Sequence, residues 1–277
     1  MLKVSERGMI PPFIVMDVMR AANERAAAGE DVMHLEVGQP STPAPRRVLE
    51  AAKRALDSQV LGYTDALGIS PLREKIARFY KTRYGIAIDP SRIIVTTGSS
   101  GGFLLAFLSA FDVGDKVGLA TPSYPAYKNI LAALGLYAVD IPVGSCSHFQ
   151  PTPELLEAYT SDLDGLIVAS PSNPTGSMID AACMNALASW CSQSDVRLIS
   201  DEIYHGITYG AAAETALTFS QDAIVVNSFS KYFSMTGWRL GWMVVPENMR
   251  RSVECLAQNL FISPPSLSQT AVLPVFD

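Results

Sequence analysis

The chain has 277 residues, of which 48% are hydrophobic and 17% are charged, and its formal net charge is −6. This is the composition of a globular protein with a sizeable core, and the acidic balance, without any cluster of Lys and Arg, argues against nucleic acid as a partner. The apolar stretch near the N-terminus is short and is interrupted by Pro11 and Pro12, so we expect no secretory leader, no membrane span and a cytoplasmic location.

The first part of the chain is predicted to be mainly helical. Helices are expected over residues 12–29, 45–56 and 71–84, and a strand over residues 32–37. The strand leads into a G-x-P turn at Gly38, and Tyr63 lies in the loop between the second and third helices. On its own, such a turn indicates only a chain reversal, and a tyrosine in a loop indicates only packing.

From residue 92 onward, short apolar runs alternate with helical patterns, which is typical of a mostly parallel, doubly wound α/β sheet with helices on both faces. Residues 229–238 are all that separates Ser228 from the last expected strand. That connection is short for a parallel crossover, so we expect the last strand to run antiparallel. Strands are expected over residues 93–96, 117–120, 137–143, 166–169, 196–200, 223–226 and 239–245, and helices over residues 103–111, 152–159, 181–193 and 247–260, with one more ending at Leu134.

Polar residues follow several of these strands, at the edge where open α/β sheets bind ligands. The Gly/Ser stretch 97–102 would present backbone N–H groups and the positive end of a helix dipole, so it is a candidate phosphate cradle. Tyr124 could be an ordinary core aromatic, and Asn173 lies in a Pro/Gly stretch that by itself indicates a turn. Asp201 could cap the next turn or stabilise a protonated ring nitrogen.

Lys231 follows the strand expected over residues 223–226 and is flanked by aromatic residues. Partial desolvation there would favour the neutral amine and lower its pKa below the usual value of about 10.4. A neutral amine can form a Schiff base with an aldehyde, whereas a lone lysine on a turn is most often a surface residue. Ser228, Ser230 and Arg239 offer donors suited to a phosphate. An amine for an aldehyde, together with donors for a phosphate, indicates pyridoxal phosphate. The aromatic neighbours of the lysine in the sequence are Phe229, Tyr232 and Phe233.

The string S-F-S-K at residues 228–231, followed by G-W-R-L-G-W at residues 237–242, closely resembles the cofactor-lysine motif of the class I/II aminotransferases. These are aspartate aminotransferase-like enzymes of fold type I that depend on pyridoxal phosphate. The string S-P-S-N-P-T-G at residues 170–176 matches a second motif of the family. The resemblance runs from about residue 11 to residue 269. It implies transfer of an amino group from an L-amino acid to a 2-oxo acid through a Schiff base on Lys231.

The resemblance also implies roles for the residues that surround the lysine. Lys231 would act as general base and acid, and Asp201 would stabilise the pyridinium nitrogen. Tyr204 and Asn173 would donate to the phenolic oxygen of the cofactor, and Tyr124 would stack on its ring. The residues implied to hold the phosphate are Ser99, Ser100, Gly101, Ser228 and Arg239.

Two further contacts and the domain organisation follow from the same resemblance. Tyr63 would reach the phosphate of a second copy in a homodimer, and Gly38 and Asn173 would contact the substrate. Residues 1–44 would form an N-terminal arm and part of a small domain, and residues 45–277 the large cofactor-binding domain.

Family members continue beyond the point where this chain stops, into the rest of the small domain, with an arginine that binds the substrate carboxylate. We therefore expect the C-terminal portion of the small domain to be absent, in a fragment of a longer enzyme or in a truncated product. The alternatives to an aminotransferase are a lyase on the same scaffold, a non-catalytic cofactor-binding sensor and an inactive fragment. The cysteines show no C-x-x-C spacing and no accompanying histidine pattern, so we expect neither a metal site nor a disulfide.

Overall fold

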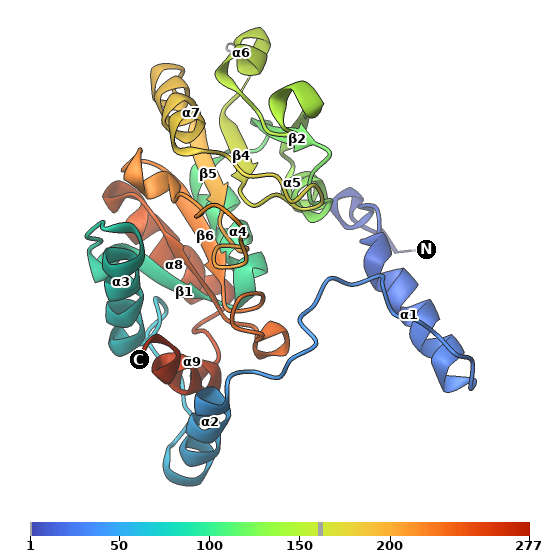
Figure 1. Ribbon diagram of the computed structural model, residues 1–277, viewed down its shortest axis with the longest axis vertical. Coiled ribbons are helices and arrows are strands. Elements are labelled where there is room, and N and C mark those ends of the chain that lie inside the picture. The colour runs from blue at the N-terminus through green and yellow to red at the C-terminus, as the bar shows by residue number, and fades with distance from the viewer. Residues whose placement is uncertain (1, 160–162) are drawn as a thin grey trace.

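Within residues 2–159 and 163–277, which the computed structural model describes, seven strands form one sheet in the order β1-β7-β6-β5-β4-β2-β3 (Figure 1). The strands are β1 (Ile93–Thr96), β2 (Lys116–Thr121), β3 (Tyr137–Pro142), β4 (Gly165–Ala169), β5 (Arg197–Asp201), β6 (Ile224–Ser228) and β7 (Gly241–Val244). β7 runs antiparallel to β1 and β6, and the other neighbouring pairs are parallel. The predicted α/β fold, with an antiparallel last strand, is confirmed.

Helices cover both faces of the sheet, and only α1 (Ile14–Ala27) among the described α-helices stands apart from it. The others are α2 (Arg46–Ser58), α3 (Ser70–Tyr84), α4 (Gly98–Ala110), α5 (Ala126–Leu134), α6 (Pro153–Leu156), α7 (Ala181–Gln193), α8 (Arg250–Leu260) and α9 (Ser266–Val272). Consecutive strand residues point to opposite sides. On β6, Val225 therefore joins an apolar cluster with residues of α2, α3, α7 and α9, whereas Val226 joins a second cluster with residues of α4, α5 and α8.

The segment before α2 departs from the prediction. α1 projects away from the sheet, and none of its residues is buried (Figure 1). The strand predicted over residues 32–37 is wrong, because no strand forms there and Met33 and Leu35 are 81% and 86% exposed. An alternating apolar pattern makes a strand only where neighbouring strands satisfy its backbone groups, and this segment lies outside the sheet.

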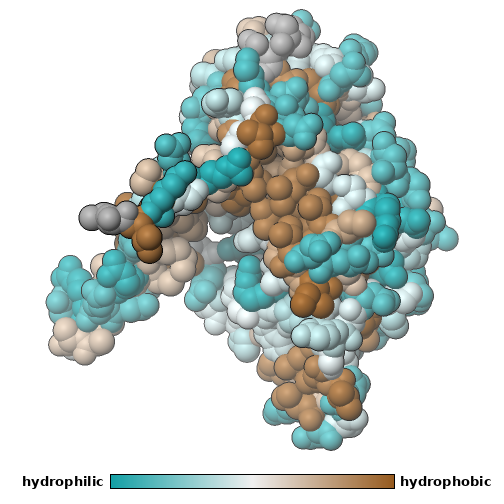
Figure 2. All heavy atoms as spheres, turned by 180° about the vertical axis from the view of Figure 1, so that it is seen from behind, coloured by the Kyte–Doolittle hydropathy of each residue, from teal (hydrophilic) through white to brown (hydrophobic). Residues whose placement is uncertain are grey.

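Two other parts of the chain were misjudged from the sequence. The Gly/Ser stretch expected as a loop already forms the first turn of α4, which begins at Gly98. α9, where no element was predicted, packs against α2. Exposed apolar side chains gather at the end of the molecule formed by α2 and the loop that follows it (Figure 2), and they include Leu56, Val60 and Leu61. No helix in the described part of the chain is both long and apolar enough to cross a membrane.

Candidate active site

A cavity of about 210 Å³ lies at the carboxyl ends of β4, β5 and β6, beside the start of α4. Parallel strands end at the same edge of a sheet, so the turns that follow them bring distant parts of the chain together. Nine of the residues singled out from the sequence line this cavity: Ser99, Ser100, Tyr124, Asn173, Asp201, Tyr204, Ser230, Lys231 and Arg239. Side chains that line it without having been assigned to the site include Phe103, Ile203 and Thr236.

Lys231 brings a partly buried amine into the cavity. Burial lowers the pKa of this amine, as the sequence suggested. Its Nζ donates a hydrogen bond to the carbonyl oxygen of Gly38 and lies 5.8 Å from the ring centroid of Tyr204. Tyr204 is thus an aromatic neighbour of the amine, and Phe229 and Phe233 pack against each other, with 5.3 Å between their ring centroids.

Asp201 is a buried carboxylate, 5% exposed, at the end of β5. The backbone N–H of Ile203 donates to its Oδ1 at 3.0 Å, and the hydroxyl of Tyr127 donates to its Oδ2. Burial raises the pKa of Asp201 to about 6, although both hydrogen bonds act to lower it. Tyr127 was not assigned a role from the sequence. The available signal was its position at the start of a helix, three residues after Tyr124 and so on the same side of the chain.

The start of α4 and Arg239 lie together at one corner of the cavity and offer groups suited to an anion. No side chain caps the N-terminus of α4, so the first backbone N–H groups of this 13-residue helix remain available to a ligand. Gly98 has a left-handed φ of 67°, and a Cβ at this position would lie 2.3 Å from Nη2 of Arg239. Glycine is therefore required for the guanidinium to approach the helix start. Arg239 itself has a φ of 51° and donates to the carbonyl of Thr236 at 2.9 Å.

The remaining residues assigned from the sequence are not part of the cavity lining. Gly101 is buried within α4, and Ser228 is buried behind Ser230, with 2.9 Å between their hydroxyl oxygens. Gly38 touches the amine of Lys231 through its carbonyl. Tyr63 is 85% exposed, in the loop between α2 and α3.

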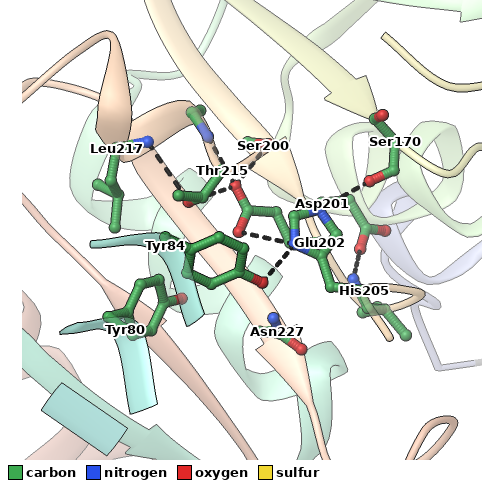
Figure 3. A network of polar contacts seen from close by, with 12 residues as sticks. Tyr80, Tyr84, Ser170, Ser200, Asp201, Glu202, His205, Thr215, Leu217 and Asn227 are labelled. Atoms are coloured by element: carbon green, nitrogen blue, oxygen red, sulfur yellow. Dashed lines mark hydrogen bonds and ion pairs between the residues drawn. The ribbon is translucent and has the colours of Figure 1, made fainter. Parts of the chain in front are cut away.

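A second polar cluster lies directly behind Asp201 (Figure 3). It includes Glu202 and His205, both buried, and Tyr84 at the end of α3. Glu202 and His205 alternate along the chain with Asp201 and Tyr204, which line the cavity. The turn after β5 thus serves two polar environments, one open to a ligand and one closed.

A partly buried amine, a buried carboxylate and an uncapped helix start thus surround one cavity of this α/β fold. Residues 30–277 match the family described as aminotransferase class I and II. The chain belongs to this family and is an aminotransferase. Members of the family depend on pyridoxal phosphate.

Named relatives and solved structures agree with this assignment. The valine–pyruvate aminotransferase of Mycobacterium tuberculosis is 52% identical over 276 residues, which cover 99% of this chain and 71% of that protein. The (5-formylfuran-3-yl)methyl phosphate transaminase of Methanocaldococcus jannaschii is 37% identical, over 96% of this chain and 70% of that protein. A crystal structure of an aminotransferase from Mycobacterium tuberculosis superposes with a TM-score of 0.97 at 52% identity, over 100% of this chain and 72% of that one. For the Thermus thermophilus aspartate aminotransferase with maleate, the TM-score is 0.95 at 30% identity, over 100% and 73% of the two chains.

Proposed function

We propose that the cavity binds pyridoxal phosphate, with Lys231 as the residue that holds its aldehyde, and that amino transfer between an L-amino acid and a 2-oxo acid takes place there. The observation that carries this proposal is that the amine of Lys231, the carboxylate of Asp201 and the guanidinium of Arg239 line the same cavity. The amine would react with the aldehyde, the carboxylate would pair with the ring nitrogen, and the guanidinium would bind the phosphate.

The residues present fit the cofactor in two respects. The donors recorded to Asp201 are uncharged, a hydroxyl and a backbone N–H, so a protonated ring nitrogen would supply the positive partner that this buried carboxylate needs. At the other end, Arg239 and the uncapped start of α4 offer a positive charge and backbone donors to a phosphate. The hydroxyls that would add to this phosphate site are those of Ser99, Ser100 and Ser230.

When bound, pyridoxal phosphate supplies an aldehyde for an amine and a ring that accepts electrons. The lowered pKa of Lys231 makes its Nζ more readily neutral, so this atom can bind a carbonyl carbon and can take up and return a proton. The Asp201 carboxylate would hold the proton on the ring nitrogen. Tyr204 and Asn173 would donate to the ring oxygen, and the ring of Tyr124 would exclude water from one face.

The substrate pair is proposed from the most similar of the relatives named above. The relative that is 52% identical is named as a valine–pyruvate aminotransferase. We therefore propose a small aliphatic L-amino acid of the valine type as amino donor and pyruvate as acceptor. Gly38 and Asn173 are proposed to contact the substrate, since Gly38 already meets the reactive amine and Asn173 lines the cavity.

A second copy of the chain is proposed to cover the end of the molecule formed by α2. Tyr63 projects into solvent from a loop that is held in place beneath it, since the Ser266 hydroxyl donates to the Gly62 carbonyl and Gln269 donates to the Thr64 hydroxyl at 3.0 Å. A fixed loop with an exposed tyrosine, beside the exposed apolar residues of Figure 2, is suited to an interface. Tyr63 would then reach the phosphate site of the partner.

The domain organisation is proposed on the same grounds. α1 contributes nothing to the buried core, whereas α2 packs against α9 at the opposite end of the sequence. Residues 1–44 are thus proposed as an arm with part of a small domain, and residues 45–277 as the large domain.

Covalent mapping tests the cofactor proposal. The chain is incubated with pyridoxal phosphate, reduced with borohydride and digested, and the peptides are weighed by mass spectrometry. A pyridoxyl group on Lys231 is the expected result. Attachment spread over surface lysines, or no attachment, would contradict the assignment.

A further inference from the structure

The polar cluster behind Asp201 has no part in the chemistry described so far, yet it is among the most deeply buried groups of the protein (Figure 3). The side chains of Glu202 and His205 are 1% and 3% exposed. Polar side chains buried this deeply are costly unless every atom is satisfied, so the arrangement of their hydrogen bonds carries information about their protons.

His205 joins three parts of the fold through its ring. Its Nε2 lies 2.9 Å from the carbonyl oxygen of Ser170, in the turn after β4, and a carbonyl can only accept, so Nε2 carries a hydrogen. Its Nδ1 lies 2.7 Å from the hydroxyl of Tyr84, at the end of α3. In the neutral ring, Nδ1 then accepts from that hydroxyl. The turn after β5 is thereby tied to the turn after β4 and to α3.

Glu202 has one oxygen that is fully used and one that is not. Oε1 accepts from the backbone N–H of Ala216 at 2.9 Å, from the hydroxyl of Thr215 at 2.9 Å and from that of Ser200 at 3.3 Å. Oε2 has no hydrogen-bond donor among the described residues and lies 3.6 Å from Nδ1 of His205. An ionised carboxylate would leave charge on Oε2 facing the lone pair of the imidazole. A proton on Oε2 removes that conflict between a negative charge and a lone pair.

The pKa shifts that burial causes in Glu202 and His205 agree with this geometry. Burial raises the pKa of Glu202 to about 8 and lowers the pKa of His205 to about 4, so both groups are uncharged near pH 6.5. Asp201, next to Glu202, then keeps the negative charge of this region on the cavity side. The other titratable groups that act on the cluster are Tyr80, Tyr84, Arg83 and Glu214.

We propose that Glu202 and His205 form an uncharged positioning pair for the cavity. His205 holds the turn that carries Asn173 against the turn that carries Tyr204, and Glu202 places a neutral acid beside the ring without adding a second charge next to Asp201. The inference deepens the proposed function and rests on it. Neither residue touches the cavity, so the pair acts through the residues that do.

His205→Ala tests the positioning role, because it leaves the Ser170 carbonyl without its donor. We expect pyridoxal phosphate to bind about tenfold more weakly, which corresponds to about 1.4 kcal/mol, the range for a lost buried partner. We also expect the pKa of the bound cofactor, read from its absorbance, to rise. If the two turns shift, Asn173 and Tyr204 donate less well to the ring oxygen and stabilise its ionised form less. His205→Gln should restore most of both readouts, since its amide can donate to Ser170.

The matched control is His148→Asn. His148 is exposed and has a φ of 51°, a conformation that Asn tolerates, so this variant should match the wild-type chain. Wild-type binding and absorbance in His205→Ala would overturn the positioning role. A wild-type chain that does not bind pyridoxal phosphate at all would instead overturn the proposed function, and the positioning role with it.

Glu202→Gln tests the proton on Glu202 by a second route that needs no cofactor. A folded pKa of about 8 against an unfolded value near 4.5 means that the folded chain holds this proton more tightly, so its stabilising effect is full below pH 4.5 and is lost as pH rises to 8. His205 acts oppositely, as pH falls from 6.5 to 4, and the effect of the Asp201 proton is lost around pH 6, so the window from pH 6.5 to 8 reports mainly on Glu202.

We expect the melting temperature of the wild-type chain to fall between pH 6.5 and 8, and that fall to be flattened in Glu202→Gln, whose amide oxygen can still accept the three bonds of Oε1. A large loss of melting temperature in Glu202→Gln at pH 6.5, with the wild-type slope retained, would show that Glu202 is ionised and would overturn the neutral pair.

Discussion

At the carboxyl ends of β4, β5 and β6, polar side chains from three turns converge on one cavity, whereas residues 2–44 reach the same place from outside the sheet. The first region rests on buried strands, and its carboxylate is itself buried. The second region touches the cavity through the Gly38 carbonyl on Lys231 and through the ring of Phe13, whose centroid is 5.5 Å from that of Tyr124. The chemistry is proposed for the edge of the sheet, and the arm lies against that edge.

The two regions differ in whether a buried core holds their side chains in place. Side chains at the edge are fixed by the core beneath them, so their substitution should change chemistry more than folding. Side chains of α1 are held by no core, so their substitution should change neither the fold nor the binding of the cofactor. The following substitutions test the comparison, beginning with the largest expected effect.

Lys231→Ala should abolish covalent attachment of pyridoxal phosphate and reduce amino transfer to the background rate, because no other amine is proposed to meet the aldehyde. Lys81→Ala, at an exposed position of α3, is the matched control and should retain both. Attachment that persists unchanged in Lys231→Ala, measured by mass spectrometry after reduction, would remove the lysine from the account.

Asp201→Ala should fold but lower kcat by about 10²–10³, the range for losing one preorganised electrostatic partner of the reacting system. The comparison is with Asp57→Ala, which removes an exposed carboxylate from α2. Steady-state kinetics, with circular dichroism to check folding, measures the effect. Full activity in Asp201→Ala would contradict its role at the ring nitrogen.

Ile76→Ala and Ile14→Ala compare the core with the arm directly. Ile76 of α3 is fully buried, so its truncation should lower the free energy of unfolding by about 2–5 kcal/mol. Ile14 of α1 is 62% exposed, so its truncation should change the free energy of unfolding by less than about 0.5 kcal/mol. Urea titration measures both, and equal losses would show that α1 is held by a core of its own.

Tyr127→Phe should have the smallest effect on the chemistry, about tenfold in kcat/KM or about 1.4 kcal/mol, as for one hydrogen bond to a charged group. The Tyr127 hydroxyl lowers the pKa of Asp201, so its loss should raise that pKa. In the proposed function the ionised carboxylate holds the ring nitrogen, so cofactor binding should weaken as pH falls through about 6 in the wild-type chain and at higher pH in the variant. An unchanged pH profile would mean that the tyrosine has no influence on Asp201.

The edge could be predicted because each of its parts is a local pattern, a buried strand followed by a polar turn. Asn173, Asp201 and Lys231 all lie where that pattern places them. Tyr127 was missed because its contact with Asp201 joins residues 74 positions apart, and its position near Tyr124 does not identify that partner. The strand expected over residues 32–37 failed for the converse reason, since local alternation was present and no neighbouring strand was there to pair with it. The Glu202 and His205 pair likewise depends on contacts with α3 and with the turn after β4 that only the fold brings together.

The most direct test of the account is a half-reaction followed by absorbance. The chain is loaded with pyridoxal phosphate, and L-valine is added without a 2-oxo acid. The account predicts loss of the absorbance of the bound aldehyde, recovery of that absorbance when pyruvate is added, and formation of alanine. A cofactor spectrum that forms and then remains unchanged with valine and with a panel of other amino acids would contradict amino transfer at this cavity.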